Sequence, residues 1–140
     1  MSVRQDPQKV SVLFVCIENS SRSIMAEAFA KKIGLEASSA GTIPSTHVNP
    51  LVVEVMKEVG VDVSKRVPKD LTEEMIEGVG LVVLTDTSLE GAIPGTLRKK
   101  MRKKVVQWNI SDPQGKSVEE IRYVRDEIER MVRQIARDSL

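Results

Sequence analysis

The segment from Val10 to Phe29 constrains the fold of this chain more strongly than any other part of the sequence. An apolar, largely β-branched run ends at Cys16, the only cysteine in the 140 residues, and Arg22 follows before a helix-forming stretch. A strand, a short loop and a helix in this order point successive backbone N–H groups into one concavity at the helix N-terminus. Such a concavity fits a tetrahedral oxyanion such as phosphate, so the segment predicts an anion-binding loop.

Cys16 and Arg22 would give this loop its chemistry. The loop amides, the helix dipole and the Arg22 charge all favour an anionic sulfur, so we expect a thiolate nucleophile near neutral pH. The planar Arg22 guanidinium can hold two oxygens of the anion at once. The alternative is a buried structural cysteine beside a surface arginine, but the strand and the helix lie where an anion-binding loop needs them. The residues predicted to bind the substrate are Ile17, Glu18, Asn19, Ser20, Ser21, Arg22 and Ser23.

Three of these loop residues carry expectations of their own. Asn19 tolerates left-handed backbone, and the Ser23 hydroxyl is placed to hydrogen-bond the thiolate. Glu18 is unusual, because a carboxylate two positions after the nucleophile would repel a dianion. We therefore expect the Glu18 N–H to face the anion and its side chain to face solvent, where it modulates specificity.

Apolar strand patterns alternate with helical patterns along the chain. This alternation predicts an α/β fold, a three-layer domain with a parallel sheet covered on both faces, and it places Cys16 at the carboxyl edge of the sheet. The last helix opens with a capping-box pattern, Ser117 and Glu120. The predicted strands are Val10–Val15, Leu35–Ser39, Leu81–Leu84 and Lys104–Val106, the last two buried; the predicted helices are Ser23–Lys32, Pro50–Val59 ended by Gly60, a short one capped by Thr72, and Ser117–Arg137.

Composition indicates one globular domain over residues 1–140, with residues 1–8 as a flexible N-terminus. The net charge is +1 and 41% of the residues are hydrophobic, and no run approaches the roughly 20 apolar residues that span a bilayer. One cysteine excludes an internal disulfide, which fits a reducing cytoplasm. His47, the only histidine, has no partner at metal-ligand spacing, so we expect no metal and interpret it as a surface loop residue.

The loop V-C-I-E-N-S-S-R-S, followed by I-M-A-E-A-F, resembles the phosphate-binding loop of the low-molecular-weight protein tyrosine phosphatase superfamily, and more narrowly the arsenate reductases built on that fold. The resemblance extends through 39–42, 49–64 and 108–113. It implies a four-stranded sheet of order 2-1-3-4, with the anion-binding loop after strand one. It also implies hydrolysis of phosphomonoesters through a phosphocysteine on Cys16, with no cofactor.

The resemblance assigns a third catalytic residue, Asp112, as the general acid that protonates the leaving oxygen. Taken alone, an Asp before Pro113 is equally a common turn-forming pair. Trp108, nearby, either lines the rim of the site or anchors the core. Relatives that act on phosphotyrosine place aromatic residues where this chain has Ile17, Gln114 and Gly115. A phosphotyrosine specialist is therefore disfavoured, which leaves small phosphomonoesters, other phosphoamino acids or arsenate.

Arsenate reduction is the alternative activity, and it needs a second thiol. Thioredoxin-coupled relatives supply two further cysteines after the third strand, but Thr85–Ala92 holds no sulfur. Reduction would therefore need an external small thiol or redoxin as partner.

A rival of another class is a phosphate-backbone binding module that uses the basic run Arg98–Lys104. Near-zero net charge and few aromatic residues disfavour nucleic acid as a partner.

Overall fold

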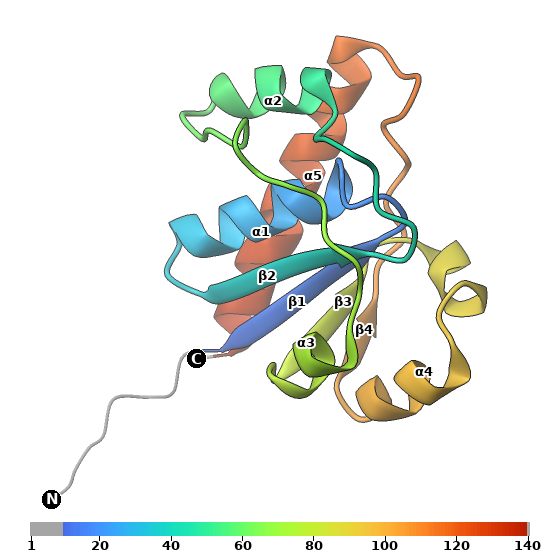
Figure 1. Cartoon of the computed structure of the whole chain (residues 1–140). Coiled ribbons are helices and arrows are strands. Elements are labelled where there is room, and N and C mark those ends of the chain that lie inside the picture. The colour runs from blue at the N-terminus through green and yellow to red at the C-terminus, as the bar shows by residue number, and fades with distance from the viewer. Residues whose placement is uncertain (1–9, 140) are drawn as a thin grey trace, which may run out of the picture.

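Four parallel strands form the centre of the computed structural model, which describes residues 10–139 (Figure 1). The strand order is β2-β1-β3-β4, and this confirms the predicted order. The second strand begins one residue later and ends two residues later than predicted. The strands are β1 (Ser11–Cys16), β2 (Glu36–Gly41), β3 (Leu81–Leu84) and β4 (Val105–Gln107).

Helices cover both faces of the sheet, so the three-layer α/β architecture is confirmed. On one face α1, α2 and α5 enclose the larger hydrophobic core, and on the other α3, η1 and α4 enclose a smaller one. The helices are α1 (Arg22–Lys32), α2 (Pro50–Lys57), α3 (Glu73–Glu77), the 3₁₀ helix η1 (Thr87–Gly91), α4 (Gly95–Met101) and α5 (Val118–Asp138). The segments η1 and α4 were not predicted: they are only five and seven residues long, and within α4 the sole apolar pair with helical spacing is Leu97 and Met101, among Arg and Lys residues.

Strand β1 is buried on both faces, which explains its unbroken apolar sequence. Side chains alternate along a strand, so Val12 and Phe14 enter the larger core while Leu13 and Val15 enter the smaller one. Trp108 packs against Phe14 with ring centroids 5.7 Å apart, and it is 5% exposed. Trp108 is therefore a core anchor rather than part of the rim.

Strand β4 corrects the prediction of a buried strand at 104–106. Val105 and Val106 are each 39% exposed. The reason is position: β4 pairs only with β3 and forms an edge of the sheet. A β-branched run predicts a strand, but it does not distinguish an edge from the centre.

The helix ends follow the capping signals in the sequence. Helix α2 ends at Lys57, earlier than Val59, and Gly60 follows with φ +79°. Helix α5 begins after Ser117, and the predicted capping box with Glu120 is present. No helix in residues 10–139 is long and apolar enough to cross a membrane. The expectation for residues 1–8 lies outside the described part of the chain.

Glu58, directly after α2, joins this helix to α5. Its carboxylate accepts hydrogen bonds from Arg122 Nη2 and Arg125 Nη1, each at 2.8 Å. The hydrogen bond from Arg122 is the main reason that the pKa of Glu58 is lowered to about 2; desolvation opposes it and Arg125 adds to it.

We expect Glu58 to stabilise the fold above its ordinary pKa of 4.5 and to lose this contribution as the pH falls toward about 2. A carboxyl whose pKa is lower in the folded than in the unfolded chain makes acid favour unfolding. The melting temperature of Glu58→Gln should lie below that of the wild type at neutral pH, and the gap should narrow through this window. Thermal unfolding at a series of pH values measures it. Glu74→Gln, at an exposed carboxylate with no ion pair within residues 10–139, is the control; a gap for Glu58→Gln that is independent of pH would contradict the prediction.

Candidate active site

The loop between β1 and α1 is held from outside by the segment that follows β2. The backbone N–H groups of 42, 43, 45 and 49 donate to the carbonyls of 16, 17, 18 and 20, over 2.8–3.1 Å. A trans peptide points its N–H and C=O in opposite directions. Carbonyls bound on the outside therefore leave the loop N–H groups facing inward, as an anion-binding loop requires.

Asn19 shapes the loop from within. Its φ is +51°, in the left-handed region that Asn tolerates. Its side-chain oxygen accepts from the Lys69 N–H at 2.9 Å, and its side-chain nitrogen donates to Ser23 Oγ at 2.8 Å. Asn19 is completely buried, so it fixes the turn of the loop rather than reaching the surface.

Cys16 is 3% exposed, and its sulfur lies at the base of the loop within reach of two groups. The Asn19 N–H donates to Sγ at 3.2 Å, and Ser23 Oγ lies 2.9 Å from Sγ. Because Ser23 Oγ already accepts from Asn19, its own hydrogen is free to point at the sulfur. The two contacts suit a negatively charged sulfur.

Gly41, the last residue of β2, allows this loop to lie close to the sheet. A Cβ at position 41 would come within 2.6 Å of the Ile17 oxygen and 2.9 Å of the Asn19 nitrogen. Both are backbone atoms of the loop, so no side-chain rotation relieves the contact. The loop and the end of β2 are therefore packed at a distance that only glycine permits.

Arg22 opens α1 with its side chain almost fully buried. Its Nη1 donates to Asp86 Oδ2 at 2.7 Å and to the Ile110 oxygen at 2.9 Å, which leaves Nη2 and Nε for a bound anion. Partial burial raises the pKa of Asp86, but hydrogen bonds from the Ser88 N–H and from Arg22 outweigh it and hold that pKa below its usual range. Asp86 thus orients the guanidinium. Sequence reasoning missed Asp86, although an Asp two residues after the end of β3 lies at the same sheet edge as Cys16.

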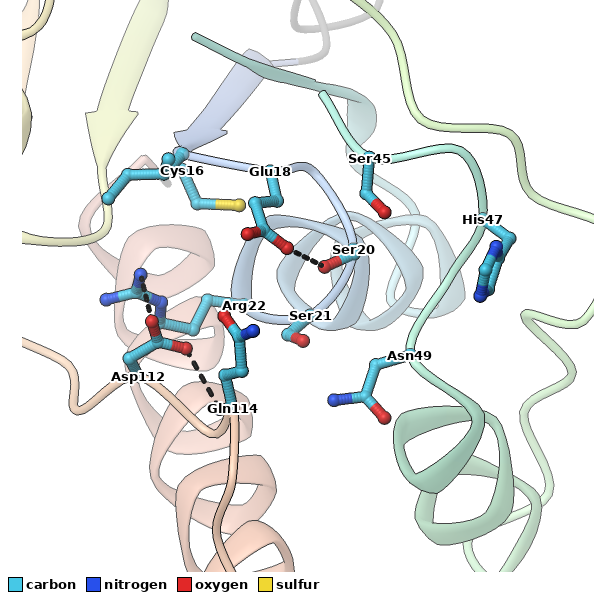
Figure 2. Close-up of a pocket in the computed structure, with 11 residues that line it drawn as sticks. Cys16, Glu18, Ser20, Ser21, Arg22, Ser45, His47, Asn49, Asp112 and Gln114 are labelled. Carbon is cyan, nitrogen blue, oxygen red and sulfur yellow. Dashed lines mark hydrogen bonds and ion pairs between the residues drawn. The ribbon is translucent and has the colours of Figure 1, made fainter. Parts of the chain in front are cut away.

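Asp112 borders the same cavity as the loop, with its side chain 52% exposed. Its Oδ1 accepts from the Gln114 N–H at 3.0 Å, and its Oδ2 is 3.9 Å from Arg22 Nη2. In Figure 2, Asp112 lies on the loop before α5, which forms one side of the pocket, and it is next to the Arg22 guanidinium. The carboxylate is thus at the mouth, where a leaving group would exit.

These residues surround a cavity of about 380 Å³. Of the residues predicted to bind the substrate, Asn19 and Ser23 do not line this cavity; they contact the Cys16 sulfur instead. The prediction that the Glu18 side chain faces solvent is corrected: this side chain is half-buried and lines the cavity. His47 is exposed as expected, yet it also lines the cavity. The lining residues are Cys16, Ile17, Glu18, Ser20, Ser21, Arg22, Ser45, His47, Asn49, Asp112 and Gln114.

Gly41→Ala should lower both the affinity for inorganic phosphate and the melting temperature. The added Cβ must push the loop backbone away from β2, and overpacking of this kind costs roughly 1–3 kcal/mol. Calorimetric titration with phosphate and thermal unfolding measure the two effects. Gly91→Ala is the matched control, because a Cβ there meets nothing within 4 Å. Wild-type phosphate affinity in Gly41→Ala would show that the loop does not need this close packing.

Comparisons with known proteins agree with this geometry. Residues 11–140 match the family model described as low molecular weight phosphotyrosine protein phosphatase. A putative arsenate reductase of Halobacterium salinarum is 34% identical over 127 residues, which cover 85% of this chain and 85% of that protein. An arsenate reductase of Staphylococcus aureus (strain Newman) is 37% identical over 123 residues, which cover 86% and 91%.

A solved structure of the YwlE arginine phosphatase from Geobacillus stearothermophilus matches with a TM-score of 0.83 at 25% identity, over 92% of each chain. The fold and the family match together show an enzyme of the cysteine phosphatase and arsenate reductase type. The chain belongs to the low molecular weight phosphotyrosine protein phosphatase family.

Proposed function

We propose that this protein hydrolyses phosphomonoesters through a phosphocysteine on Cys16. The observation that carries the proposal is the position of the Cys16 sulfur, at the base of a cavity whose loop amides face inward and which Arg22 borders. Because the nucleophile must stay reduced, we place the activity in the cytoplasm.

The reaction has two steps. In the first, the Cys16 thiolate attacks phosphorus, the loop amides and Arg22 bind the equatorial oxygens, and Asp112 gives its proton to the leaving alcohol. In the second, Asp112 takes a proton from water, the water oxygen attacks phosphorus, and the S–P bond breaks. Inorganic phosphate and the thiolate result, so Cys16, Arg22 and Asp112 suffice without a cofactor.

The cavity favours substrates other than phosphotyrosine. Its lining residues include no Phe, Tyr or Trp, so none of these side chains is there to stack on a phenyl ring. We therefore propose small phosphomonoesters and non-aromatic phosphoamino acids as substrates. Phosphoarginine is one candidate, because a structural neighbour is named an arginine phosphatase.

Arsenate reduction is the second candidate, since one relative is named an arsenate reductase and another a putative arsenate reductase. Reduction of arsenate to arsenite takes two electrons, which two thiols supply as they join in a disulfide. This chain has a single cysteine. The second thiol must then come from a small thiol or a redoxin, which would attack the Cys16 adduct.

Asp112→Asn should lose activity mainly on esters with poor leaving groups. An amide cannot donate the acid proton, so kcat/KM for an alkyl phosphate should fall about 10²-fold or more, whereas the loss for 4-nitrophenyl phosphate should be much smaller. The ratio kcat/KM is the right measure, because it reports only the steps up to release of the leaving group.

Two variants complete this test. Cys16→Ser should turn over neither ester, because a hydroxyl stays protonated where a thiolate forms. Asp62→Asn is the matched control, since Asp62 accepts from the Ser64 N–H just as Asp112 accepts from the Gln114 N–H. Turnover by Cys16→Ser would refute the proposed function, and equal losses on both esters would remove Asp112 as the acid.

Thioredoxin, thioredoxin reductase and NADPH alone should not support arsenate reduction by this protein. Thioredoxin-coupled reduction within one chain needs further cysteines, and Thr85–Ala92 has none. Added glutathione with glutaredoxin should allow arsenite to form, and only when Cys16 is present. Arsenite measured over many turnovers decides the matter; rapid formation with thioredoxin as the sole donor would contradict the prediction.

A further inference from the structure

Glu18 places a carboxylate in the wall of a site built for anions. The side chain is half-buried and lines the cavity beside Cys16. Figure 2 shows its carboxylate among the lining side chains, with Oε1 3.5 Å from Ser20 Oγ. Its backbone is held as well, since the Glu18 carbonyl accepts from the Ser45 N–H at 2.9 Å. The backbone that carries this charge is therefore held by the segment after β2.

No cation within residues 10–139 forms an ion pair with Glu18. Arg22, the cation of this site, is directed to Asp86 and the Ile110 oxygen and has Asp112 as its other acidic neighbour. The Glu18 carboxylate is thus left without an ion-pair partner among these residues. Inward-facing amides and Arg22 make the base of the cavity positive, whereas the Glu18 carboxylate places a negative charge in its wall.

This separation of charge fits a zwitterionic substrate better than a simple anion. The phosphoryl group would occupy the positive base, and a cationic group a few bonds away would lie beside the Glu18 carboxylate. A second negative group at that place would be repelled, and so would the outer oxygens of free phosphate.

We propose that Glu18 makes this site select phosphomonoesters that carry a cationic group close to the phosphoryl group. The inference rests on the proposed phosphatase function for turnover, but not for binding. A partly exposed ion pair changes an affinity by up to about fivefold, so Glu18 contributes a preference among substrates rather than the basal affinity.

The test compares O-phosphoethanolamine with propyl phosphate, which are similar in size and differ by one positive charge. The wild type should favour phosphoethanolamine, and in Glu18→Gln the ratio of the two kcat/KM values should fall about fivefold, mainly through KM. Glutamine keeps an oxygen for Ser20 and removes only the charge. Any intrinsic difference in reactivity between the two esters cancels in this comparison of variants.

Two further variants control for charge and fold. Glu36→Gln, at an exposed carboxylate where β2 begins, on the edge of the sheet away from the loop, should keep the wild-type ratio. Glu18→Asp should keep part of the preference, because the charge remains. Added salt should reduce the preference of the wild type and leave that of Glu18→Gln unchanged.

Binding measured without turnover separates this inference from the proposed function. In a Cys16→Ser background, calorimetry should show that Glu18→Gln weakens phosphoethanolamine relative to propyl phosphate and tightens inorganic phosphate. Absence of turnover by the wild type would refute the phosphatase proposal and leave this result standing. Equal affinity ratios with and without Glu18→Gln would overturn the selective role of Glu18.

Discussion

The hydrogen bonds that hold the outer side of the Cys16 loop decide what the rest of the molecule can do. Each loop carbonyl that binds the segment after β2 turns its peptide N–H toward the cavity. The donors are thus oriented before an anion arrives, and little free energy is spent on reorganising them during a reaction. Cys16 and Arg22 act beside these oriented donors: the Cys16 sulfur lies beneath the loop N–H groups, and the Arg22 guanidinium lies at their edge.

The contacts that hold the Cys16 loop and Arg22 come from residues far apart in the sequence. Asn19 is held by the Lys69 backbone, Arg22 by Asp86 and the Ile110 oxygen, and the loop carbonyls by 42–49. The parallel sheet makes this possible, because it brings the carboxyl ends of β1, β2 and β3 to one edge. The larger core, with Trp108 against Phe14, fixes the strand that carries Cys16.

The local part of this arrangement could be predicted from the sequence. The apolar run, Cys16, Arg22 and the following helix occupy about twenty consecutive residues, and the physics that joins them acts over that distance. Asp112 needed the family resemblance, because an Asp before a Pro is compatible with any turn.

The rest could not be predicted, for physical reasons that differ from case to case. Asp86 is recognisable only once Arg22 is seen beside it, since contacts across the sheet leave no local pattern. Glu18 depends on the direction of one side chain from a loop, which the sequence does not specify. The exposure of β4 depends on which strand has a single neighbour, and in α4 one apolar pair, Leu97 and Met101, is too short a pattern to identify a helix of seven residues.

Gly41 links the chemistry of the loop to the pairing of the strands. In the β1–β2 ladder it lies opposite Cys16, with Ala40 opposite Val15. If β2 shifted by one residue along β1, Ala40 or Thr42 would take its place, and a methyl or larger group would meet the loop backbone. A chain folded with misaligned strands would thus be inactive, however compact it was. Catalytic turnover in this protein is consequently an assay of strand alignment, and it distinguishes correctly refolded molecules from merely collapsed ones.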